Sequence, residues 1–577
     1  MGKTVRITGK TVGIGHQDFE QIIKNDIFYI DKTDFIREWW ENKDAVTLIT
    51  RPRRFGKTLN LSMLECFFST KYAGRKDLFE GLSIWDNEEY RVLQGTYPVI
   101  FISFAGVKAD NIKDAKNGII NAIASAYEAH KYLKESDVLN KEEKRNFEVL
   151  QNYSINLFAS KKIAETTITA SVRTLSMYLE RYYGKKVLIL LDEYDTPLQE
   201  AYVYGYWDGL VTYIRGLFNL AFKTNPYLNR AIMTGITRVS KESIFSDLNN
   251  LEVVTTTSSM YSTAFGFTES EVFAALDREG AGQREEVKQW YDGFTFGQCK
   301  DIYNPWSIIN FLKERIVATY WADTSSNKLV SVLVREGTPD LKMQMEDLLA
   351  GNCLEEVLDE QVVFDQLRST RGAVWSLLMA SGYLKPVDRH FNHDTGKYLY
   401  KLKITNYETK IMFKNMISGW FPESLISYSY FREALIAGDI GYMNQFMNEI
   451  SEEIFSTFDT GRKPSERTHP ERFYHGFVLG LVVDLAGRYH IRSNRESGLG
   501  RYDVMMEPVN LEDNAIIIEF KVFSPYKDGT LKKAVEDALR QIEDKKYDTE
   551  LISRGIPKEK IKHYGFAFDG KRVLIGE

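Results

Sequence analysis

The sequence predicts an α/β protein in three parts: an N-terminal parallel sheet covered by helices, a central, mostly helical region, and a compact C-terminal α/β module. In the first half of the chain, short and almost continuously apolar runs alternate with longer helical patterns, as is typical of a parallel sheet buried on both faces. The pattern turns helical after about residue 270, and short strands resume after about residue 466. Because 577 residues are too many for one core, we expect domains at 1–269, 270–465 and 466–577.

The composition describes an ordinary protein with nearly balanced charge. The 74 basic and 80 acidic side chains leave a net charge of −6, which excludes a globally basic nucleic-acid coat and restricts any nucleic-acid contact to a local patch. The three cysteines form neither a zinc pattern nor a disulfide framework, so we expect a cytoplasmic protein. No apolar run reaches membrane-spanning length, and the N-terminal residues do not resemble a signal peptide, so we expect no membrane association.

The predicted elements of the N-terminal half are five strands and three long helices. The strands are expected at Ala45–Ile49, Val99–Ser103, Val187–Leu191, Arg230–Met233 and Leu251–Thr255. The helices are expected at Leu59–Phe68, Asn111–Tyr132 and Ile163–Tyr183.

A phosphate-binding loop is predicted between the first of these strands and the helix that follows it. The order of strand, tight turn, Gly56-Lys57-Thr58 and helix directs backbone N–H groups towards anionic oxygens. Lys57 is expected to reach the outer phosphates and the Thr58 hydroxyl to bind Mg²⁺. The expected nucleotide-binding residues of this loop are Arg53, Arg54, Phe55, Gly56, Lys57, Thr58 and Leu59.

The loop departs from the usual pattern at its first position. A glycine is usual five residues before Gly56, and this chain has Arg51 there, followed by Pro52. Arg53 and Arg54 have two interpretations at this stage: they grip phosphates, or they pair with acidic side chains and hold the shape of the loop.

Two carboxylates follow the third apolar strand and support a nucleotide site. Asp192 and Glu193 come directly after Val187–Leu191, at the sheet edge where ligands of open α/β sheets bind. Asp192 is expected to hold Mg²⁺ together with Thr58, and Glu193 to orient or deprotonate an attacking water. The alternative is that this acidic pair only caps the next helix.

The strand at Arg230–Met233 also ends in polar residues. We expect Thr234 to sense the terminal phosphate, and Arg238 to stabilise transition-state charge in cis or across a subunit interface. A surface ion pair is the equal alternative for Arg238. In the central region, the segment Val374–Leu378, a turn and the strand Tyr398–Ile404 suggest a winged-helix unit, with a helical linker as the alternative.

The C-terminal module carries a second set of chemical groups. Helices are expected at Arg472–Leu485 and Lys532–Lys546, and strands at Arg501–Met506, Ala515–Val522, Tyr564–Phe568 and Arg572–Ile575. Asp503 lies on the first of these strands, while Glu519 and Lys521 lie two apart on the second and therefore face the same side. Carboxylates from neighbouring strands can hold Mg²⁺, or Mn²⁺, and the lysine can position water at a scissile phosphate.

Further residues of the C-terminal module are candidates for metal or DNA contact. Glu471, ahead of the first helix, is a third possible metal ligand, although acids favour helix N-termini anyway. Arg492, Arg495 and Arg501 near a glycine-rich turn are candidates for DNA contact. The lysines of the helix at 532–546 alternate with acids and are better explained as a solvated face.

Two family resemblances follow from these motifs. The stretches Phe28–Thr33, Arg51–Thr58, Leu191–Asp195 and Thr234–Arg238 resemble the AAA-ATPase-like proteins. That resemblance implies a P-loop ATPase of the ASCE type, with ATP and Mg²⁺ as cofactors, Glu193 as catalytic base and the Arg-Pro-Arg-Arg-Phe loop as the family's own variant. Asp503 and Glu519-Phe520-Lys521, with Gln541 on the next helix, resemble PD-(D/E)XK nucleases, although Tyr502 stands where that signature has proline.

The functional expectation combines the two resemblances. It is an ATP-hydrolysing protein with a fused Mg²⁺-dependent nuclease domain that processes nucleic acid, expected to be DNA. We expect a defence or mobile-element role, and the chain could assemble into homo-oligomers. The alternative is a nucleotide-switch ATPase whose nuclease-like domain binds partners or nucleic acid without cutting. A decayed nuclease domain with a surviving Glu519–Lys521 ion pair would fit that alternative.

Overall fold

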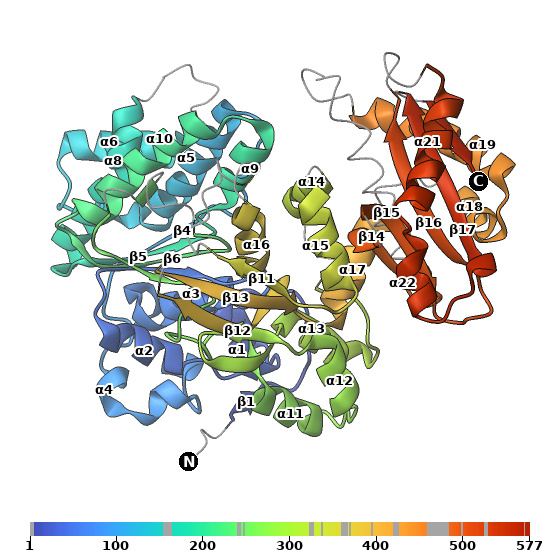
Figure 1. Ribbon diagram of the computed structural model, residues 1–577. Helices are drawn as coiled ribbons and strands as arrows, with labels where there is room; N and C mark the ends of the chain where they lie inside the picture. Colours follow the sequence, from blue (N-terminus) through green and yellow to red (C-terminus); the bar gives the residue numbers. More distant parts are fainter. Residues whose placement is uncertain are drawn as a thin grey trace. The chain divides into compact units, whose positions relative to one another are not determined.

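The computed structural model describes most of the chain. The described residues are 5–153, 164–238, 244–245, 248–321, 328–335, 339–358, 367, 371–393, 396–418, 426–458, 480, 484–497, 500–523, 529–569 and 572–577. Contacts group the chain into two compact units, which are described separately (Figure 1). The first unit comprises Met1–Leu329 and Glu355–Thr409, and the second comprises Val330–Leu354 and Lys410–Glu577. The three domains expected from the sequence remain a prediction, because residues of the central region contribute to both units.

A five-stranded sheet of parallel strands forms the centre of the first unit, in the order β4-β5-β6-β3-β7. Its strands are β3 (Val46–Thr50), β4 (Val99–Ser103), β5 (Val187–Asp192), β6 (Leu228–Gly235) and β7 (Leu251–Val254). All five predicted strands are therefore confirmed within two residues at each end. Because β3 and β5 both pair with β6, the loop after β3 and the acids at the end of β5 lie at the same sheet edge.

Helices cover both faces of this sheet. Figure 1 shows α5, α8 and α10 on one side of β4, β5 and β6, and α2 and α3 on the other. The helices of this unit up to β6 are α1 (Phe19–Lys24), α2 (Asp34–Asn42), α3 (Lys57–Phe68), α4 (Glu88–Arg91), α5 (Ile112–Ala129), α6 (Lys141–Gln151), α8 (Glu165–Tyr183), α9 (Thr196–Tyr204) and α10 (Trp207–Phe218). β5 is buried at every residue, which explains its unbroken apolar run.

Small sheets and further helices complete the first unit. The strands are β1 (Ile7–Thr8), β2 (Tyr29–Ile30), β8 (Phe267–Thr268), β9 (Phe294–Phe296), β10 (Cys299–Tyr303), β12 (Leu384–Asn392) and β13 (Lys397–Ile404), with β11 (Leu354–Val357) beside β13. The helices are α11 (Glu269–Arg278), α12 (Arg284–Tyr291), α13 (Pro305–Glu314) and α16 (Arg371–Ala380). Helix α16 followed by the β12–β13 hairpin agrees with the predicted helix and strand, whereas the winged-helix assignment stays a prediction.

The second unit is built on a mixed sheet in the order β14-β15-β16-β17-β18. Its strands are β14 (Tyr489–Ser497), β15 (Gly500–Pro508), β16 (Ala515–Val522), β17 (Ile561–Asp569) and β18 (Arg572–Gly576). β16 and β17 are parallel, and the other neighbouring strands are antiparallel. The helices assigned wholly to this unit are α15 (Pro339–Leu349), α18 (Ile426–Ala437), α19 (Ile440–Phe458), α21 (Leu531–Asp544) and α22 (Asp548–Ser553).

Two apolar layers cover this mixed sheet. Ile516, Ile518 and Phe520 of β16 pack in one cluster with side chains of α18 and α19. Ile517, on the alternate face of β16, packs in another cluster with Ile542 of α21. Glu519 and Lys521 have the same parity as Ile517, so they lie on the α21 side. Two helices, α14 (Lys328–Arg335) and α17 (Tyr407–Ser418), contain residues assigned to each unit.

A buried carboxyl attaches helix α15 to the outer strand of the mixed sheet. Glu346 is 5% exposed, and its two oxygens accept the Ser493 hydroxyl at 2.8 and 2.7 Å. Burial raises the pKa of Glu346 to about 8, so this carboxyl holds its proton at neutral pH. Sequence reasoning did not connect α15 with this mixed sheet.

Within the residues that the structure describes, no helix is both long and apolar enough to cross a membrane.

Candidate functional site

The predicted phosphate-binding loop connects β3 to α3. Gly56 is the N-cap of α3, with φ 78°, a backbone conformation that glycine adopts without a steric penalty. Arg54 adopts a similar conformation, with φ 66°. No side chain caps the N-terminus of α3, so its first N–H groups are not satisfied by a side chain and suit an anion.

Arg51, in place of the usual glycine, is buried and supports the loop from beneath. Its guanidinium donates to the carbonyl oxygens of Thr50 at 2.9 Å, Thr255 at 2.6 Å and Met260 at 3.3 Å. It also lies 4.5 Å from the centre of the Phe296 ring. Burial lowers the pKa of Arg51 to about 9, and the three carbonyls with the ring face still favour the charged form. Arg51 therefore fixes the end of β3.

Residues far along the chain hold the middle of the loop. The carbonyl oxygen of Arg53 accepts from the Asn304 side-chain amide at 3.3 Å and from the Trp321 indole at 3.1 Å. The Arg53 guanidinium donates to the Gln199 side chain at 3.3 Å, and the Arg54 guanidinium lies 4.2 Å from the Trp306 ring centre. Sequence reasoning missed Asn304, Trp306 and Trp321; the local signal at the first two is only that Asn304-Pro305 favours a turn.

Lys57 is buried and points into the loop. Its ammonium group donates to the carbonyl oxygens of Arg51 at 3.0 Å and Pro52 at 2.8 Å. Burial lowers the pKa of Lys57, and the nearby charges of Glu193 and Asp192 partly offset that effect. The contacts to the two carbonyls fix the position of the ammonium group within the loop.

Asp192 receives two hydroxyl groups from different elements. Oδ2 accepts from Thr58 of α3 at 2.7 Å, and Oδ1 accepts from Thr234 of β6 at 2.6 Å. Burial raises the pKa of Asp192, and both hydrogen bonds act against that rise. These contacts bring together three of the predicted residues. Because carboxylate and hydroxyl oxygens are ligands that Mg²⁺ prefers, Thr58 and Asp192 fit a magnesium site.

The two acids after Asp192 have different environments. Glu193 has φ 51° and accepts the Thr196 hydroxyl at 3.0 Å. Asp195 is 1% exposed, and its Oδ2 accepts the backbone N–H groups of Ile236 at 3.0 Å and Thr237 at 2.9 Å. Asp195 thus ties the turn after β6 to the turn after β5, a role that sequence reasoning did not assign.

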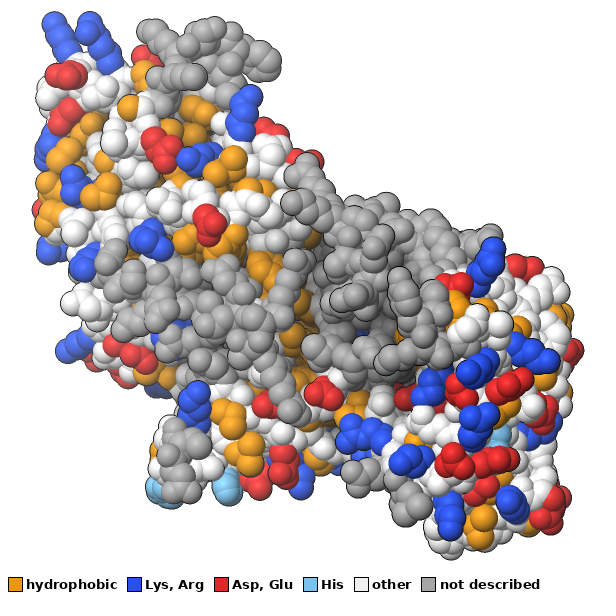
Figure 2. All heavy atoms as spheres, turned by 45° about the horizontal axis from the view of Figure 1, so that its top comes forward, with side chains coloured by type: hydrophobic (Ala, Val, Ile, Leu, Met, Phe, Trp, Pro, Cys, Tyr) orange, Lys and Arg blue, Asp and Glu red, His pale blue; other side chains and the backbone are white. Residues whose placement is uncertain are grey.

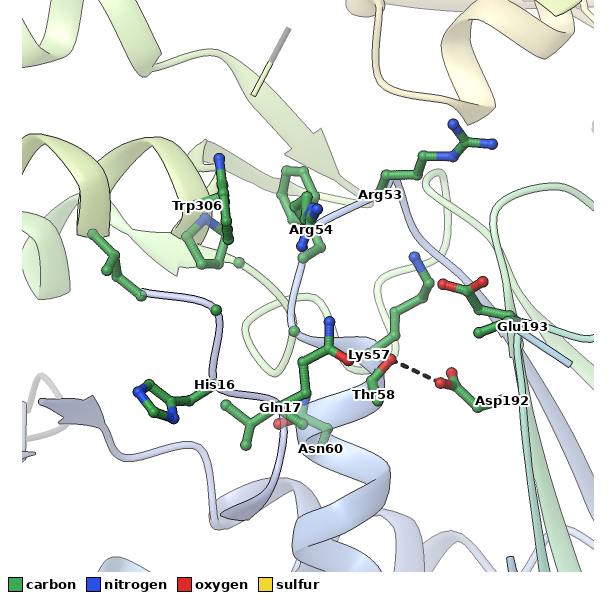
Figure 3. A pocket seen from close by; sticks show the side chains of 18 of the residues that line it. His16, Gln17, Arg53, Arg54, Lys57, Thr58, Asn60, Asp192, Glu193 and Trp306 are labelled. Atoms are coloured by element: carbon green, nitrogen blue, oxygen red, sulfur yellow. Dashed lines mark hydrogen bonds between the residues drawn. The ribbon is translucent and has the colours of Figure 1, made fainter. Parts of the chain in front are cut away.

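A cavity of about 490 Å³ opens beside this loop (Figure 3). Lys57, Thr58, Asp192 and Glu193 converge at one end, and His16 lies at the other. The predicted loop residues that line it are Arg53, Arg54, Phe55, Gly56, Lys57, Thr58 and Leu59. Thr234 and Arg238 are not among the lining residues: Thr234 acts through Asp192, whereas Arg238 is only partly buried beyond the turn. This cavity volume is within the range of small-molecule sites.

The predicted residues of the C-terminal module meet on two adjacent strands. Val504 of β15 pairs with Ile518 of β16, and the antiparallel register then places Asp503 opposite Glu519. Asp503 Oδ2 accepts the backbone N–H of Phe520 at 2.8 Å. The Lys521 ammonium lies 3.5 Å from Glu519 Oε1, so both side chains face the same side, as predicted.

Gln541 of α21 connects the acid with the lysine. Its amide nitrogen donates to Glu519 Oε1, and its amide oxygen accepts from the Lys521 ammonium. The same nitrogen donates to the Tyr547 hydroxyl at 3.1 Å, and that hydroxyl donates to the Arg501 carbonyl at 2.6 Å. Gln541 therefore fixes the orientation of both groups relative to β15 and β16.

Glu519 has one oxygen available for a further partner. It is 2% exposed, and its Oε2 is buried with no hydrogen bond. Burial, and secondly the charge of Asp503, raise the pKa of Glu519 to about 8. A divalent cation would satisfy the unpaired oxygen and favour the ionised form, so Asp503 and Glu519 fit a metal ion.

The remaining candidates of this module include two arginines that pair with acids. Glu471 lies outside the described residues, as does most of the predicted helix Arg472–Leu485. Arg492 pairs with Glu550 at 2.9 Å, and Arg495 pairs with Asp347 of α15. Two of the arginines proposed for DNA contact are therefore engaged with acids. Figure 2 shows blue and red side chains interspersed on the described part of one face, in agreement with the balanced composition.

The fold and the motifs define a protein that joins a P-loop α/β domain to a C-terminal nuclease-like α/β domain. Residues 13–245 match the family described as predicted AAA-ATPase, and residues 469–577 match the PD-(D/E)XK nuclease superfamily. The chain therefore contains an AAA-ATPase-like domain followed by a PD-(D/E)XK nuclease superfamily domain, which confirms both resemblances found in the sequence. The chain is also 26% identical over 566 residues to a protein of Azotobacter chroococcum mcd 1, described as "Uncharacterized protein in vnfD 5'region", with 95% of each chain covered.

Proposed function

We propose that this protein is an ATPase with a fused, metal-dependent nuclease that cleaves DNA in the cytoplasm, in a defence or mobile-element role. The observation that carries the proposal is the group formed by Glu519, Lys521 and Gln541 next to Asp503, in which a buried carboxylate oxygen has no partner. A domain that only kept its fold would gain nothing from burying that oxygen unsatisfied.

At the nucleotide site, each residue has a specific task in the proposal. The N-terminal N–H groups of α3 and the Lys57 ammonium bind the phosphates of ATP. Thr58 and Asp192 hold Mg²⁺, which supplies charge neutralisation on the phosphates when bound. Glu193 takes a proton from the attacking water, and Arg238 stabilises charge in cis or from a neighbouring copy of the chain.

At the nuclease site, Asp503 and Glu519 hold Mg²⁺ or Mn²⁺, which supplies Lewis-acid activation at the scissile phosphate when bound. Lys521 positions the attacking water and lies near the developing negative charge. Gln541 keeps Glu519 and Lys521 in place through its two amide atoms. ATP binding or hydrolysis in the N-terminal domain controls cutting in this scheme, and homo-oligomers are one form of that control.

A plasmid assay tests this proposal directly. Purified protein is incubated with supercoiled plasmid, linear duplex and single-stranded DNA, with Mg²⁺ or Mn²⁺, in the presence and absence of ATP. Metal-dependent cutting that changes with ATP supports the proposal. If no substrate is cut under any of these conditions while ATP is hydrolysed, the nuclease half of the proposal is wrong.

The second candidate is a nucleotide-switch ATPase whose C-terminal domain binds nucleic acid or partners without cutting it. This candidate is favoured by the pKa of Glu519, which is about 8, so that this side chain is largely protonated at neutral pH without a metal. Titration with Mn²⁺ separates the two candidates, since only the nuclease requires Glu519-dependent metal binding.

A further inference from the structure

One face of the β12–β13 hairpin in the first unit is buried at the base of the hairpin and exposed to solvent at its tip. The pairs along this face, from base to tip, are Leu384–Ile404, Pro386–Leu402, Arg389–Tyr400 and Phe391–Tyr398. At the base, Leu384 and Leu402 are at most 2% exposed. At the tip, Phe391 is 41% and Tyr398 43% exposed. The apolar face is therefore longer than the core that covers it.

The exposed end of this face is an ordered aromatic and cationic cluster. The Phe391 and Tyr398 ring centres lie 5.0 Å apart at an interplanar angle of 61°. The His393 ring lies 5.0 Å from Phe391, and the Arg389 guanidinium lies 5.4 Å from the Tyr398 ring centre. A cross-strand aromatic pair stabilises a hairpin, yet that role does not require rings so open to solvent.

The charge of the hairpin has one dominant sign. Residues 384–404 contain five lysines and arginines and two acids, Asp388 and Asp394, whereas the whole chain has a net charge of −6. Lys385 is mostly buried near Asp292 and Asp301, and Lys401 lies 3.9 Å from Glu355. Arg389 and Lys397 are both exposed near the tip, beside His390 and His393. Arg389 and Lys397 thus place two exposed cationic side chains beside the two exposed rings.

We propose that this hairpin tip, formed by Arg389, Phe391, Lys397 and Tyr398, binds single-stranded nucleic acid. Exposed rings offer stacking surfaces for unpaired bases, and the neighbouring cations complement the phosphate backbone. Paired bases keep their faces covered by their neighbours, so the two rings favour single strands over duplex. The inference rests on the proposed function in one respect, namely that the chain acts on nucleic acid, and it assigns a contact for that substrate to the ATPase-bearing unit.

Binding without cutting tests the aromatic part. The affinity of the full-length protein for a fluorescent oligothymidylate is measured by anisotropy in EDTA, where metal-dependent cleavage is prevented. Tyr398→Ala is expected to bind about tenfold more weakly, since stacking on an aromatic ring accounts for about this factor or more per base. Tyr182→Ala on α8 is the matched control, because Tyr182 is also 43% exposed and packs on a neighbouring tyrosine, and it should bind like the wild type.

Salt dependence tests the charged part. A plot of the logarithm of the binding constant against the logarithm of salt concentration has a negative slope, and Lys397→Glu should make it shallower by about 0.7 or more. Lys186 is an exposed lysine before β5, and Lys186→Glu should not change this slope. Three outcomes overturn the inference: Tyr398→Ala binds like the wild type, duplex DNA binds more tightly than the single strand, or light scattering shows a wild-type dimer that Tyr398→Ala abolishes. The last outcome would assign the tip to a second copy of the chain. Failure to cut plasmid with intact oligonucleotide binding would contradict the nuclease and leave the hairpin assignment standing.

Discussion

Asp192 and Glu519, the buried acids of the two candidate sites, differ in how completely their oxygens are hydrogen-bonded. Asp192 in the AAA-ATPase-like domain has both carboxylate oxygens hydrogen-bonded, to Thr58 and Thr234. Glu519 in the nuclease superfamily domain has one oxygen bonded to Gln541, while the other is buried and unpaired. Both oxygens of Asp192 are thus satisfied by the chain itself. The second site contains a polar group whose burial is unfavourable until a ligand arrives.

This difference indicates where each site depends on a bound ion. At the nucleotide site, the threonine hydroxyls already orient Asp192, so losing one of them should reduce activity without removing it. At the nuclease site, Glu519 lacks a substitute partner for its free oxygen. Substitutions at both sites test this difference, and their expected effects decrease from Glu519 to Thr234.

The largest effect is expected from Glu519→Gln. The amide keeps the shape of the side chain but removes the charge that holds a divalent ion, so metal-dependent cleavage should fall by about a thousandfold. The measurement is the plasmid-nicking rate in Mg²⁺. Glu543→Gln, an exposed position on α21, is the control and should cut normally. A Glu519→Gln protein that nicks at the wild-type rate would show that the chemistry lies elsewhere.

Lys57→Ala should have the next largest effect, at the other site. Lys57 is a buried cation placed at the phosphate end of the cavity, so its loss should lower ATP turnover by about a hundredfold. Phosphate release is the measurement, and Lys71→Ala, an exposed lysine shortly after α3, is the control. Unchanged turnover in Lys57→Ala would contradict the ATPase assignment, whereas unchanged DNA cutting without ATP would separate the two sites.

The stability of the contact between α15 and β14 should depend on pH through Glu346. The pKa of Glu346 is about 8 in the folded protein, above the usual value of a glutamate, so the folded state keeps a proton that the open state releases. This contribution to stability is present at low pH and is lost as the pH rises towards 8. Hydrogen exchange of β14 and α15, corrected for intrinsic rates, should report opening that increases up to about tenfold per pH unit. Glu346→Gln should remove this dependence, and an unchanged profile would refute it.

Thr234→Val should produce the smallest effect. The change removes one of the two hydrogen bonds to Asp192 and keeps the size of the side chain, so ATP turnover should fall by about fivefold, the equivalent of one ordinary hydrogen bond. Thr224→Val, at an exposed position before β6, is the control. A loss as large as that of Lys57→Ala would mean that Thr234 contacts the nucleotide itself.

The strands and the acids of both sites could be predicted because their signals are local. The apolar run Val187–Leu191 predicts a buried parallel strand, and the residues directly after it must lie at the sheet edge. Likewise, Glu519 and Lys521 share a face because they are two residues apart on a strand. The Arg51 position was noted as a departure from the pattern, but its role could not be derived, because its carbonyl partners at Thr255 and Met260 are more than 200 residues away.

The missed features depend on contacts between distant segments or on polar strands. β14 was not predicted, because Tyr489–Ser497 contains several charged and polar residues rather than an apolar alternation. Asn304 and Trp321 reach the loop through Arg53, and Glu346 reaches β14 through Ser493; no sequence spacing encodes these contacts. The assignments of Arg238 and Glu471 remain predictions.

The buried Arg51 has a consequence for the thermodynamics of nucleotide binding. A glycine-rich loop is free to sample many conformations before a ligand arrives, and ordering it then opposes binding through lost conformational entropy. In this chain, the loop becomes ordered when the domain folds, because Arg51 donates to backbone carbonyls and the Trp321 indole donates to the Arg53 carbonyl. Calorimetry should therefore find a smaller unfavourable entropy for ATP binding here than in Arg51→Gly, in which the entrance to the loop regains its freedom.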